Sequence, residues 1–462
     1  MGPPRLGPAK KAPKDKKKPP QVPPRAKQGR IGTGGTGIDL TATIPLTLQQ
    51  LLLNVFKSAL LTTRGQVWNN TNNKNNNYDH DTTPVTGPNS HQLDIKELIQ
   101  TIKSHLYNRD FDSAFTDASG DLLRAYALRW SSTRALGYAG IFKAVFRGIL
   151  NPQAHATNHV VCIGGGAGAE IVALAAVWRD LLDGRDRNML LTEGVSSVSL
   201  EEKESGTSST LASTLPSSSN PRCTTSSRPS LSSSSTTTRP HHPGLSVTAV
   251  DIADWSIVIN RLTSAIQSSN VPSGPKTQTA PLLDPNMGPF SVRLQRSDVL
   301  SISEGQLNEL LNPQEKKQSP PTATVLVTLM FTLNELFSTS MAKTTGFLLR
   351  MTDILRPGAV LLIVDSPGSY STLKLGKGKS SAGGGEGEGG VRSAQQERHY
   401  PMKFLLDHTL LSVAEGKWEQ VFSQDSRWWR RDVAELRYDV GEGAGLEDMR
   451  FQVHIYRRLE GR

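Results

Sequence analysis

An apolar run, a glycine-rich turn and an alanine-rich stretch follow one another directly in this chain. Residues 160–163 are Val-Val-Cys-Ile, residues 164–168 are Gly-Gly-Gly-Ala-Gly, and residues 170–178 have a helical composition. This order predicts a strand, a tight turn and a helix. Glycine lets the backbone approach a ligand closely, and the first turn of a helix offers unpaired N–H groups. The segment therefore indicates a ligand-binding unit of an α/β fold.

Further apolar strands alternate with helical stretches after this unit. Strands are predicted at 245–252, 290–300, 322–333, 359–365, 417–424 and 449–458. Helices are predicted at 255–267, before 355 and near 402–413. No helix separates the last two strands, which suggests an antiparallel hairpin at the edge of the sheet. The whole pattern predicts an α/β doubly wound sheet.

Helical periodicity also marks the region ahead of the first strong strand. Helices are predicted at 46–61, 93–111 and 122–150. The third helix carries five basic residues, which form either a solvated face or part of an RNA platform. They are Arg124, Arg129, Arg134, Lys143 and Arg147.

Four stretches have compositions that do not favour packing: 1–40, 65–91, 184–243 and 371–398. In residues 195–239, for example, 25 of 45 positions are Ser or Thr. Such a segment has too few apolar side chains for their burial to offset the entropy lost when the chain becomes ordered. We expect a disordered basic tail at 1–40 and a helical region at 41–150 with a disordered loop near 65–91. The sheet domain then spans 151–462, with disordered insertions near 184–243 and 371–398.

Charge is concentrated at the N-terminus. Residues 1–30 hold ten Lys or Arg and a single acid, Asp15, so this segment carries +9 of the net charge of +10. A basic arm on a near-neutral body predicts a salt-sensitive attraction to phosphates.

The remaining composition excludes several classes of protein. The two cysteines, Cys162 and Cys223, cannot form a disulfide framework, and neither lies in a zinc-binding pattern. We therefore expect no metal and a reducing compartment. No apolar run of 18 residues and no N-terminal apolar segment exist, so we expect neither a membrane span nor a secretory signal.

Two acids narrow the choice of ligand. Asp251 ends the strand after the glycine unit, where a carboxylate can accept both ribose hydroxyls. When the Ser-rich insertion is left out, Asp251 lies about 20 residues beyond the glycine turn, which is the spacing of a ribose-binding acid. Asp298 ends the third strand, where it can accept from an adenine amino group. Gly164, Gly166 and Ala169 also fit the GxGxxA pattern of dinucleotide enzymes. A nicotinamide enzyme does not account for the second acid, so S-adenosylmethionine is the favoured ligand.

The chain resembles the class I S-adenosylmethionine-dependent methyltransferases, and more narrowly the fungal large-subunit (25S) ribosomal-RNA uridine-N3 methyltransferases. The resemblance is carried by AYALRWSSTRALGYAGIF (125–142), VVCIGGGAGAE (160–170), VTAVDIADWS (247–256), LVTLMFTLNELF (326–337) and LEDMRFQVHIYRR (446–458). It implies a Rossmann-like, mostly parallel seven-stranded sheet with a reversed last strand.

The same resemblance implies an enzyme that methylates N3 of a uridine in large-subunit ribosomal RNA, free or in a preribosome. Carried over by position, four residues would line the methionine end of the cofactor, Asp251 would bind the ribose and Asp298 the adenine. The four are Gly164, Gly166, Gly168 and Glu170.

The residues themselves restrict the chemistry. Methylation at C5 of a pyrimidine needs a cysteine nucleophile, and neither cysteine is suitably placed. Residues 332–335 lack the Asn/Asp-Pro-Pro-Tyr element of amine methyltransferases. Our hypothesis is that Asn334 or Glu335, together with Asp365, holds the uracil edge. Alternatively, Glu335 starts a helix and Asp365 caps a turn.

Residues 427–431, Arg-Trp-Trp-Arg-Arg, interleave cations with aromatic rings. This composition suits phosphates and unstacked bases, although tryptophans also serve as core anchors of a strand. Two rival functions stay open: an RNA- or ribosome-binding protein that keeps the fold without catalysis, and a methyltransferase of another substrate class. From the basic arm we expect the nucleus or nucleolus, with the cytoplasm as the alternative.

Overall fold

The structure is a computed structural model, and its description covers most of the sheet domain and the helical region. The described residues are 38–61, 93–150, 157–201, 242–274, 278–313, 324–368, 370–374 and 397–460, with only the backbone of 189–201, 370–374 and 397–399. All of them belong to one unit, Ile38–Arg462.

A seven-stranded sheet forms the centre of this unit, with the order β3-β2-β1-β4-β5-β9-β8. Its strands are β1 (Thr157–Ile163), β2 (Gly244–Asp251), β3 (Phe290–Arg296), β4 (Thr324–Met330), β5 (Val360–Asp365), β8 (Trp418–Trp429) and β9 (Met449–Arg458). Strands β1 to β5 are parallel, and β9 runs antiparallel to both β5 and β8. The predicted seven-stranded, mostly parallel sheet with a reversed last strand is confirmed.

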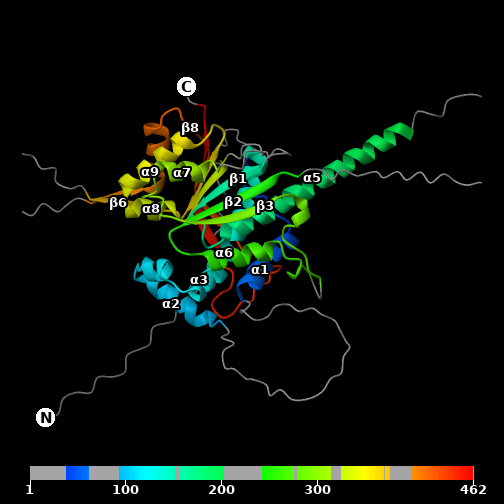
Figure 1. Ribbon diagram of the computed structural model, residues 1–462, viewed down its shortest axis with the longest axis horizontal. Helices are drawn as coiled ribbons and strands as arrows, with labels where there is room; N and C mark the ends of the chain where they lie inside the picture. The colour runs from blue at the N-terminus through cyan, green and yellow to red at the C-terminus, as the bar shows by residue number, and fades with distance from the viewer. Residues whose placement is uncertain are drawn as a thin grey trace, which may run out of the picture. The chain divides into compact units, whose positions relative to one another are not determined.

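Helices cover both faces of the sheet (Figure 1). They are α1 (Leu46–Leu61), α2 (Ile95–Tyr107), α3 (Gly120–Tyr126), α4 (Ser132–Val145), α5 (Ala169–Glu201), α6 (Ser256–Ile266), α7 (Glu304–Leu311), α8 (Leu333–Thr339), α9 (Met341–Ile354) and α10 (Met402–Asp407). Four π-helical segments adjoin them: Asp112–Thr116, Ala127–Ser131, Phe146–Leu150 and His408–Val413.

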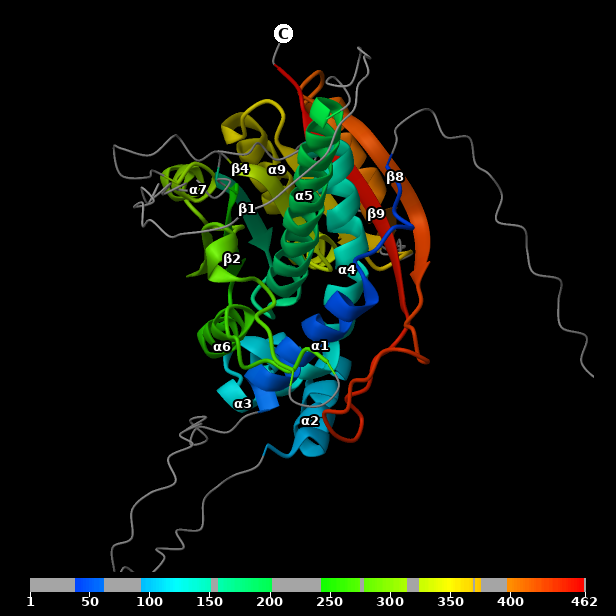
Figure 2. The same cartoon turned by 90° about the vertical axis from the view of Figure 1, so that its right-hand side faces the viewer.

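The period-two alternation of the central strands produces two hydrophobic cores. Val160 and Cys162 of β1 belong to the core that contains the buried side chains of α1 to α6. Val161 and Ile163 belong to the other core, which contains those of α7 to α10. Because helices lie on both faces, β1, β4 and β5 are buried almost throughout, as parallel strands usually are. Figure 2 shows α4 and α5 in front of the sheet, with β9 and β8 at its edge.

Two of the stretches expected to be disordered begin or end in regular structure. Helix α5 continues to Glu201, so the expectation of disorder is wrong for residues 184–201. The helix extends this far because residues 184–193 include good helix formers such as Arg, Met and Leu. Strands β6 (Tyr370–Lys374) and β7 (Glu397–Pro401) pair antiparallel and bracket the Gly-rich stretch. The expected tail and loops at 1–37, 62–92, 202–241 and 375–396 lie outside the described residues.

Three of the five basic residues of the helical region are buried, so these three form neither a solvated face nor a surface platform. Arg124 donates its Nε–H to the carbonyl oxygen of Leu60 at 3.1 Å, and Arg129 pairs with Glu447. Lys143 lies 3.0 Å from Asp180 of α5. Arg129 and Lys143 join the helical region to the sheet domain, whereas Arg124 joins α3 to α1 within the helical region. None of the described helices is long and apolar enough to cross a membrane.

The buried pair of Lys143 and Asp180 generates a test of stability. Asp180→Ala leaves the Lys143 ammonium, whose side chain is 10% exposed, without its acid partner and is expected to lower the free energy of unfolding by about 3 kcal/mol. Asp183→Ala, which breaks the more exposed pair with Arg179 one turn along α5, should cost under about 1 kcal/mol. Urea unfolding followed by circular dichroism measures both. Equal losses would contradict the assignment.

Candidate functional site

The glycine turn after β1 has a backbone that other residues adopt only with strain. Gly164 and Gly168 have φ angles of +76° and +80°. The Gly164 N–H donates to the carbonyl oxygen of Val250 at the end of β2, 2.8 Å away. A Cβ atom at Gly166 would collide with the ring of Trp255. Close packing, as well as backbone freedom, therefore requires glycine here.

Asp251 joins this turn to the end of β2. Its Oδ2 accepts the N–H of Gly166 at 3.1 Å, and its Oδ1 accepts the N–H of Ala253 at 3.1 Å. Burial raises the pKa of this carboxyl above its ordinary value, although the two backbone donors oppose the shift. The carboxylate is thus held rigidly at the edge of the sheet, with lone pairs left for a ligand.

A cavity of about 380 Å³ opens at the carboxyl ends of β1, β2, β4 and β5, where ligands bind in sheets of this topology. Six of the predicted site residues line it: Gly164, Asp251, Asp298, Asn334, Glu335 and Asp365. Gly166, Gly168 and Glu170 are not lining residues; they form the turn and the start of α5 behind it.

Asp298 follows β3 at the far end of this cavity. Its Oδ1 accepts the N–H of Leu300 at 2.9 Å, and its Oδ2 accepts the hydroxyl of Ser301 at 2.9 Å. Ile252, which is 51% exposed, and Val299 line the same part of the cavity. A flat apolar ring with a polar edge fits between such walls.

Asn334, Glu335 and Asp365 meet at the other end of the cavity. The Asp365 carboxylate accepts two backbone N–H groups, from Asn334 at 3.0 Å and from Ser366 at 2.7 Å. It therefore binds one N–H in the first turn of α8 and the N–H of Ser366. The alternative interpretation placed Glu335 at the start of a helix and Asp365 as the cap of a turn, and these contacts agree with it. Asn334 Oδ1 is buried and has no hydrogen-bond partner among the described residues.

Glu335 lines the cavity as an exposed residue. Partial desolvation of its carboxyl group, and then repulsion from Asp365, raises the pKa of Glu335 to about 7. Burial likewise raises the pKa of Asp365. A carboxyl group with a pKa near neutrality can take up a proton from a ligand and release it to water.

Arg134 is the cation of the lining set. From the sequence it was assigned only, with four other basic residues, to a solvated face or part of an RNA platform. Its Nη1 donates to the Tyr126 hydroxyl at 3.0 Å, and its guanidinium lies 5.0 Å from the centre of the Phe331 ring. Phe331 itself has a φ of +60°, a strained conformation for a bulky residue, and its N–H donates to the carbonyl oxygen of Val364.

Aromatic side chains from the helical region complete the wall, and sequence reasoning did not identify them. The rings of Phe115 and Tyr126 lie 5.2 Å apart, and that of Tyr126 lies 5.7 Å from Trp255. A signal was present: Tyr126, Trp130 and Arg134 recur at four-residue steps and so share one helical face. The region ahead of the sheet is therefore part of the site.

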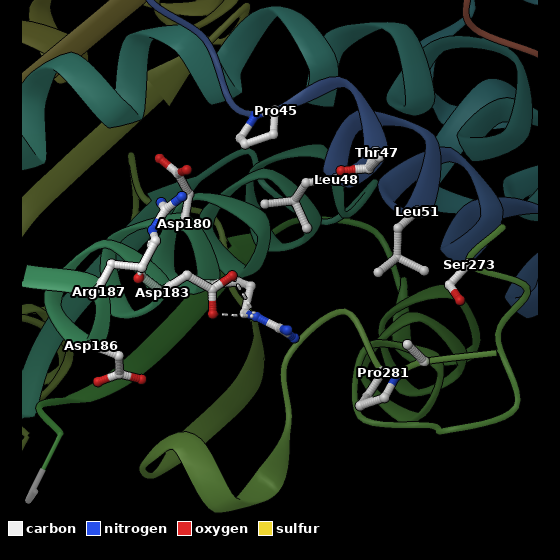
Figure 3. Close-up of a pocket in the computed structure, with 12 residues that line it drawn as sticks. Pro45, Thr47, Leu48, Leu51, Asp180, Asp183, Asp186, Arg187, Ser273 and Pro281 are labelled. Atoms are coloured by element: carbon white, nitrogen blue, oxygen red, sulfur yellow. Dashed lines mark hydrogen bonds and ion pairs between the residues drawn. The ribbon is translucent and has the colours of Figure 1, made fainter. Parts of the chain in front are cut away.

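A second hollow, of about 480 Å³, lies between α1 and α5 (Figure 3). Asp180, Asp183 and Asp186 line it together with Pro45 and other residues, but none of the glycine turn does. Among the residues that the structure describes, no group of three or more His, Cys, Asp or Glu is placed to hold a metal ion. The cavity at the glycine turn remains the candidate site.

Comparison with known proteins agrees with this geometry. Residues 80–457 match a family model described as "Putative SAM-dependent methyltransferase". The chain belongs to this family of S-adenosylmethionine-dependent methyltransferases. It is 29% identical over 373 residues, 78% of each chain, to the 25S rRNA (uridine(2843)-N(3))-methyltransferase of Saccharomyces cerevisiae.

Solved structures with the same type of fold are more distant. A SAM-dependent methyltransferase from Methanosarcina mazei is 10% identical, covers 67% of this chain and 96% of its own, and has a TM-score of 0.27. The 16S rRNA (adenine(1408)-N(1))-methyltransferase from Catenulisporales acidiphilia is 12% identical, with coverages of 66% and 90% and a TM-score of 0.27.

The cavity of this methyltransferase fits its cofactor electrostatically. Four acids line it, against the single cation of the lining set, Arg134. Such a surplus of negative charge favours a ligand with a positively charged sulfur. The acids are Asp251, Asp298, Glu335 and Asp365.

Glu170, at the start of α5, generates a test of pH dependence. It is buried, its Oε1 has no partner among the described residues, and burial raises its pKa to about 8. The folded state therefore holds this proton more tightly than the unfolded state, so stability falls as pH rises from about 4.5 to 8. Glu170→Gln removes that loss.

We expect the variant to melt several degrees higher than the parent at pH 8 and at nearly the same temperature at pH 4.5, as measured by differential scanning fluorimetry. Glu309→Gln, at an exposed position of α7, is the matched control and should show no such trend. A pH-independent difference for Glu170→Gln would contradict the buried-acid assignment.

Proposed function

We propose that this protein methylates N3 of a uridine in large-subunit ribosomal RNA. The observation that carries the proposal is its 29% identity, over 78% of both chains, to a yeast enzyme of that activity. The titratable Glu335 beside Asn334 at one end of the cavity supports the same chemistry, because N3 of uridine must lose a proton. The substrate is ribosomal RNA, free or within a preribosome.

The proposed cofactor contacts follow the layout of the cavity. Asp251, at the end of β2, accepts the ribose hydroxyls, and Asp298 accepts from the adenine amino group between Ile252 and Val299. Gly164, Gly166 and Gly168 keep the turn close to the methionine end, and Glu170 supports that turn from the start of α5. S-adenosylmethionine supplies a methyl group on a positively charged sulfur and leaves as a neutral thioether.

The uracil lies, in this proposal, against the wall made by β4, β5 and α8. Glu335 accepts the N3 proton as N3 forms its bond to the methyl carbon and the sulfur–carbon bond breaks. Asn334 presents its amide to the polar edge of the base, and Asp365 holds Asn334 in place through its backbone. Arg134 offsets the negative charge of the deprotonated base.

The described cysteine supports attack by nitrogen rather than activation of C5. Cys162 is fully buried in β1 and does not line the cavity, and burial raises its thiol pKa well above the ordinary value. Cys223 lies outside the described residues.

We also propose a nuclear or nucleolar location, with the cytoplasm as the alternative. The support is the composition of residues 1–30, whose ten basic residues suit both import and attraction to RNA. Imaging of a fluorescently tagged full-length chain tests this point.

The proposed activity is tested by nucleoside analysis of ribosomal RNA. Loss of the gene should remove 3-methyluridine from large-subunit RNA, and the complementing parent chain should restore it, as measured by mass spectrometry of hydrolysed RNA. Asp251→Asn should weaken cofactor binding in isothermal titration and should fail to complement. Unchanged 3-methyluridine after gene loss would refute the substrate; absence of S-adenosylmethionine binding by the parent would favour an RNA-binding protein without catalysis.

Glu335→Gln tests the proton acceptor. The turnover rate of the parent should rise with pH through about 7, because only the ionised carboxylate accepts the N3 proton. The variant should turn over about 100-fold more slowly at pH 7.5, without that inflection, and recover at alkaline pH where uridine ionises unaided. Glu304→Gln on α7 is the control, and cofactor affinity should stay constant. A variant with the parent's rate and pH profile would exclude Glu335 as the base.

A further inference from the structure

The segment of residues 427–431 divides between the core and the surface. Trp429 packs against the core beside Gly137, and Arg427 donates to the carbonyl oxygen of Leu40 at 2.7 Å. Trp428, by contrast, is 50% exposed. Because neighbouring side chains of a strand point to opposite faces, Trp428 lies on the face opposite to Trp429. Trp429 is therefore a core anchor of the strand, as one interpretation expected, whereas Trp428 lies at the surface.

Two arginines flank the exposed ring. The guanidinium of Arg430 lies 4.2 Å from the centre of the Trp428 ring, and that of Arg450, which is opposite Trp428 in the register of β8 and β9, lies 5.9 Å away. Arg430 also pairs with Asp448, whereas no ion pair of Arg450 occurs among the described residues. We call Trp428, Arg430 and Arg450 the Trp428 platform.

Strand direction brings this platform to the edge of the sheet that holds the site. Strand β8 is antiparallel to β9, and β9 is antiparallel to β5, so β8 runs in the same direction as β5. Trp428 is near the carboxyl end of β8, and Asp365 ends β5. In Figure 2 the arrow of β8 points toward the end of the molecule where α3 and α6 lie.

The register places the platform on the same face as Asp365. Gln452 of β9 is opposite Asp365, and Arg450, two residues earlier in β9, is opposite Trp428. Trp428 is two strands away from Asp365 across the sheet and two residues away along the strand direction. The Cα atoms of the two residues are therefore roughly 12 Å apart. A few nucleotides of single-stranded RNA span such a distance.

Further positive charge lies next to the platform in sequence, because Arg427 and Arg431 belong to the same segment as Trp428 and Arg430. Cations around an exposed aromatic ring suit a phosphate backbone with unstacked bases, because the ring stacks on a base while the cations bind phosphates.

We propose that the Trp428 platform binds single-stranded RNA next to the modified uridine, by stacking one base on Trp428 and holding a phosphate with Arg450. The inference rests on the proposed function for the identity of the RNA. It explains how an exposed tryptophan at the end of an edge strand serves the site: the platform fixes the neighbouring nucleotide and so orients the uridine in the cavity.

The test measures binding of a short fluorescein-labelled oligouridylate to the full-length protein by fluorescence anisotropy at several salt concentrations. Trp428→Ala should raise Kd about tenfold with an unchanged salt slope, and Trp428→Phe should keep most of the affinity. Arg450→Ala should reduce the slope of log K against log salt by about 0.7, the value for one phosphate of a single strand. Tyr107→Ala, at an 89% exposed aromatic on α2, is the control.

The proposal would be overturned if Trp428→Ala bound the oligouridylate as tightly as the parent. It would also be overturned if Tyr107→Ala lost as much affinity as Trp428→Ala. If Trp428→Ala melts at a lower temperature than the parent, the salt slope of Arg450→Ala decides: an unchanged slope overturns the proposal. Methylation assays separate this failure from that of the proposed function. A Trp428→Ala enzyme with parent-like KM for RNA refutes the platform alone, whereas RNA binding through Trp428 without uridine methylation refutes the function alone.

Discussion

The contact between Asp251 and the Gly166 N–H fixes the geometry on which the site depends. It joins the turn after β1 to the end of β2, while the Gly164 N–H makes a second link to Val250. Each hydrogen bond is modest in energy, but a buried carboxylate without its donors costs far more than the bonds contribute. The turn can hold this position only with glycine at Gly166, because the ring of Trp255 occupies the space of a side chain.

Charge balance in the cavity follows from this rigidity. Desolvation raises the pKa values of Asp251, Glu335 and Asp365, and Arg134 opposes the shift at Glu335 and Asp365. With one cation among four lining acids, the site keeps a carboxyl group that titrates near neutral pH. A carboxyl group with such a pKa can accept the uridine proton near neutral pH and release it to water.

The sheet and the cofactor edge could be predicted because they depend on local patterns. Strands such as β1 and β5 are continuous apolar runs, and Asp251 and Asp298 stand at strand ends where parallel topology brings side chains together. The wall containing Phe115 and Arg134 could not be predicted in this way, because long-range packing brings that helical region against the cavity. The hairpin of β6 and β7 was missed because the two strands are short and far apart in sequence.

The position of Arg134 argues against a functional boundary near residue 150. Its side chain reaches Tyr126 and Phe331, so it links the helical region to the turn after β4. Lys143 ties the same region to Asp180 of α5. Residues 151–462 alone would retain the glycine turn and the acids but lose the cation and the aromatic wall. The helical region thus supplies one wall of the cavity and the cation of its lining, so its folding and the electrostatics of the site are coupled.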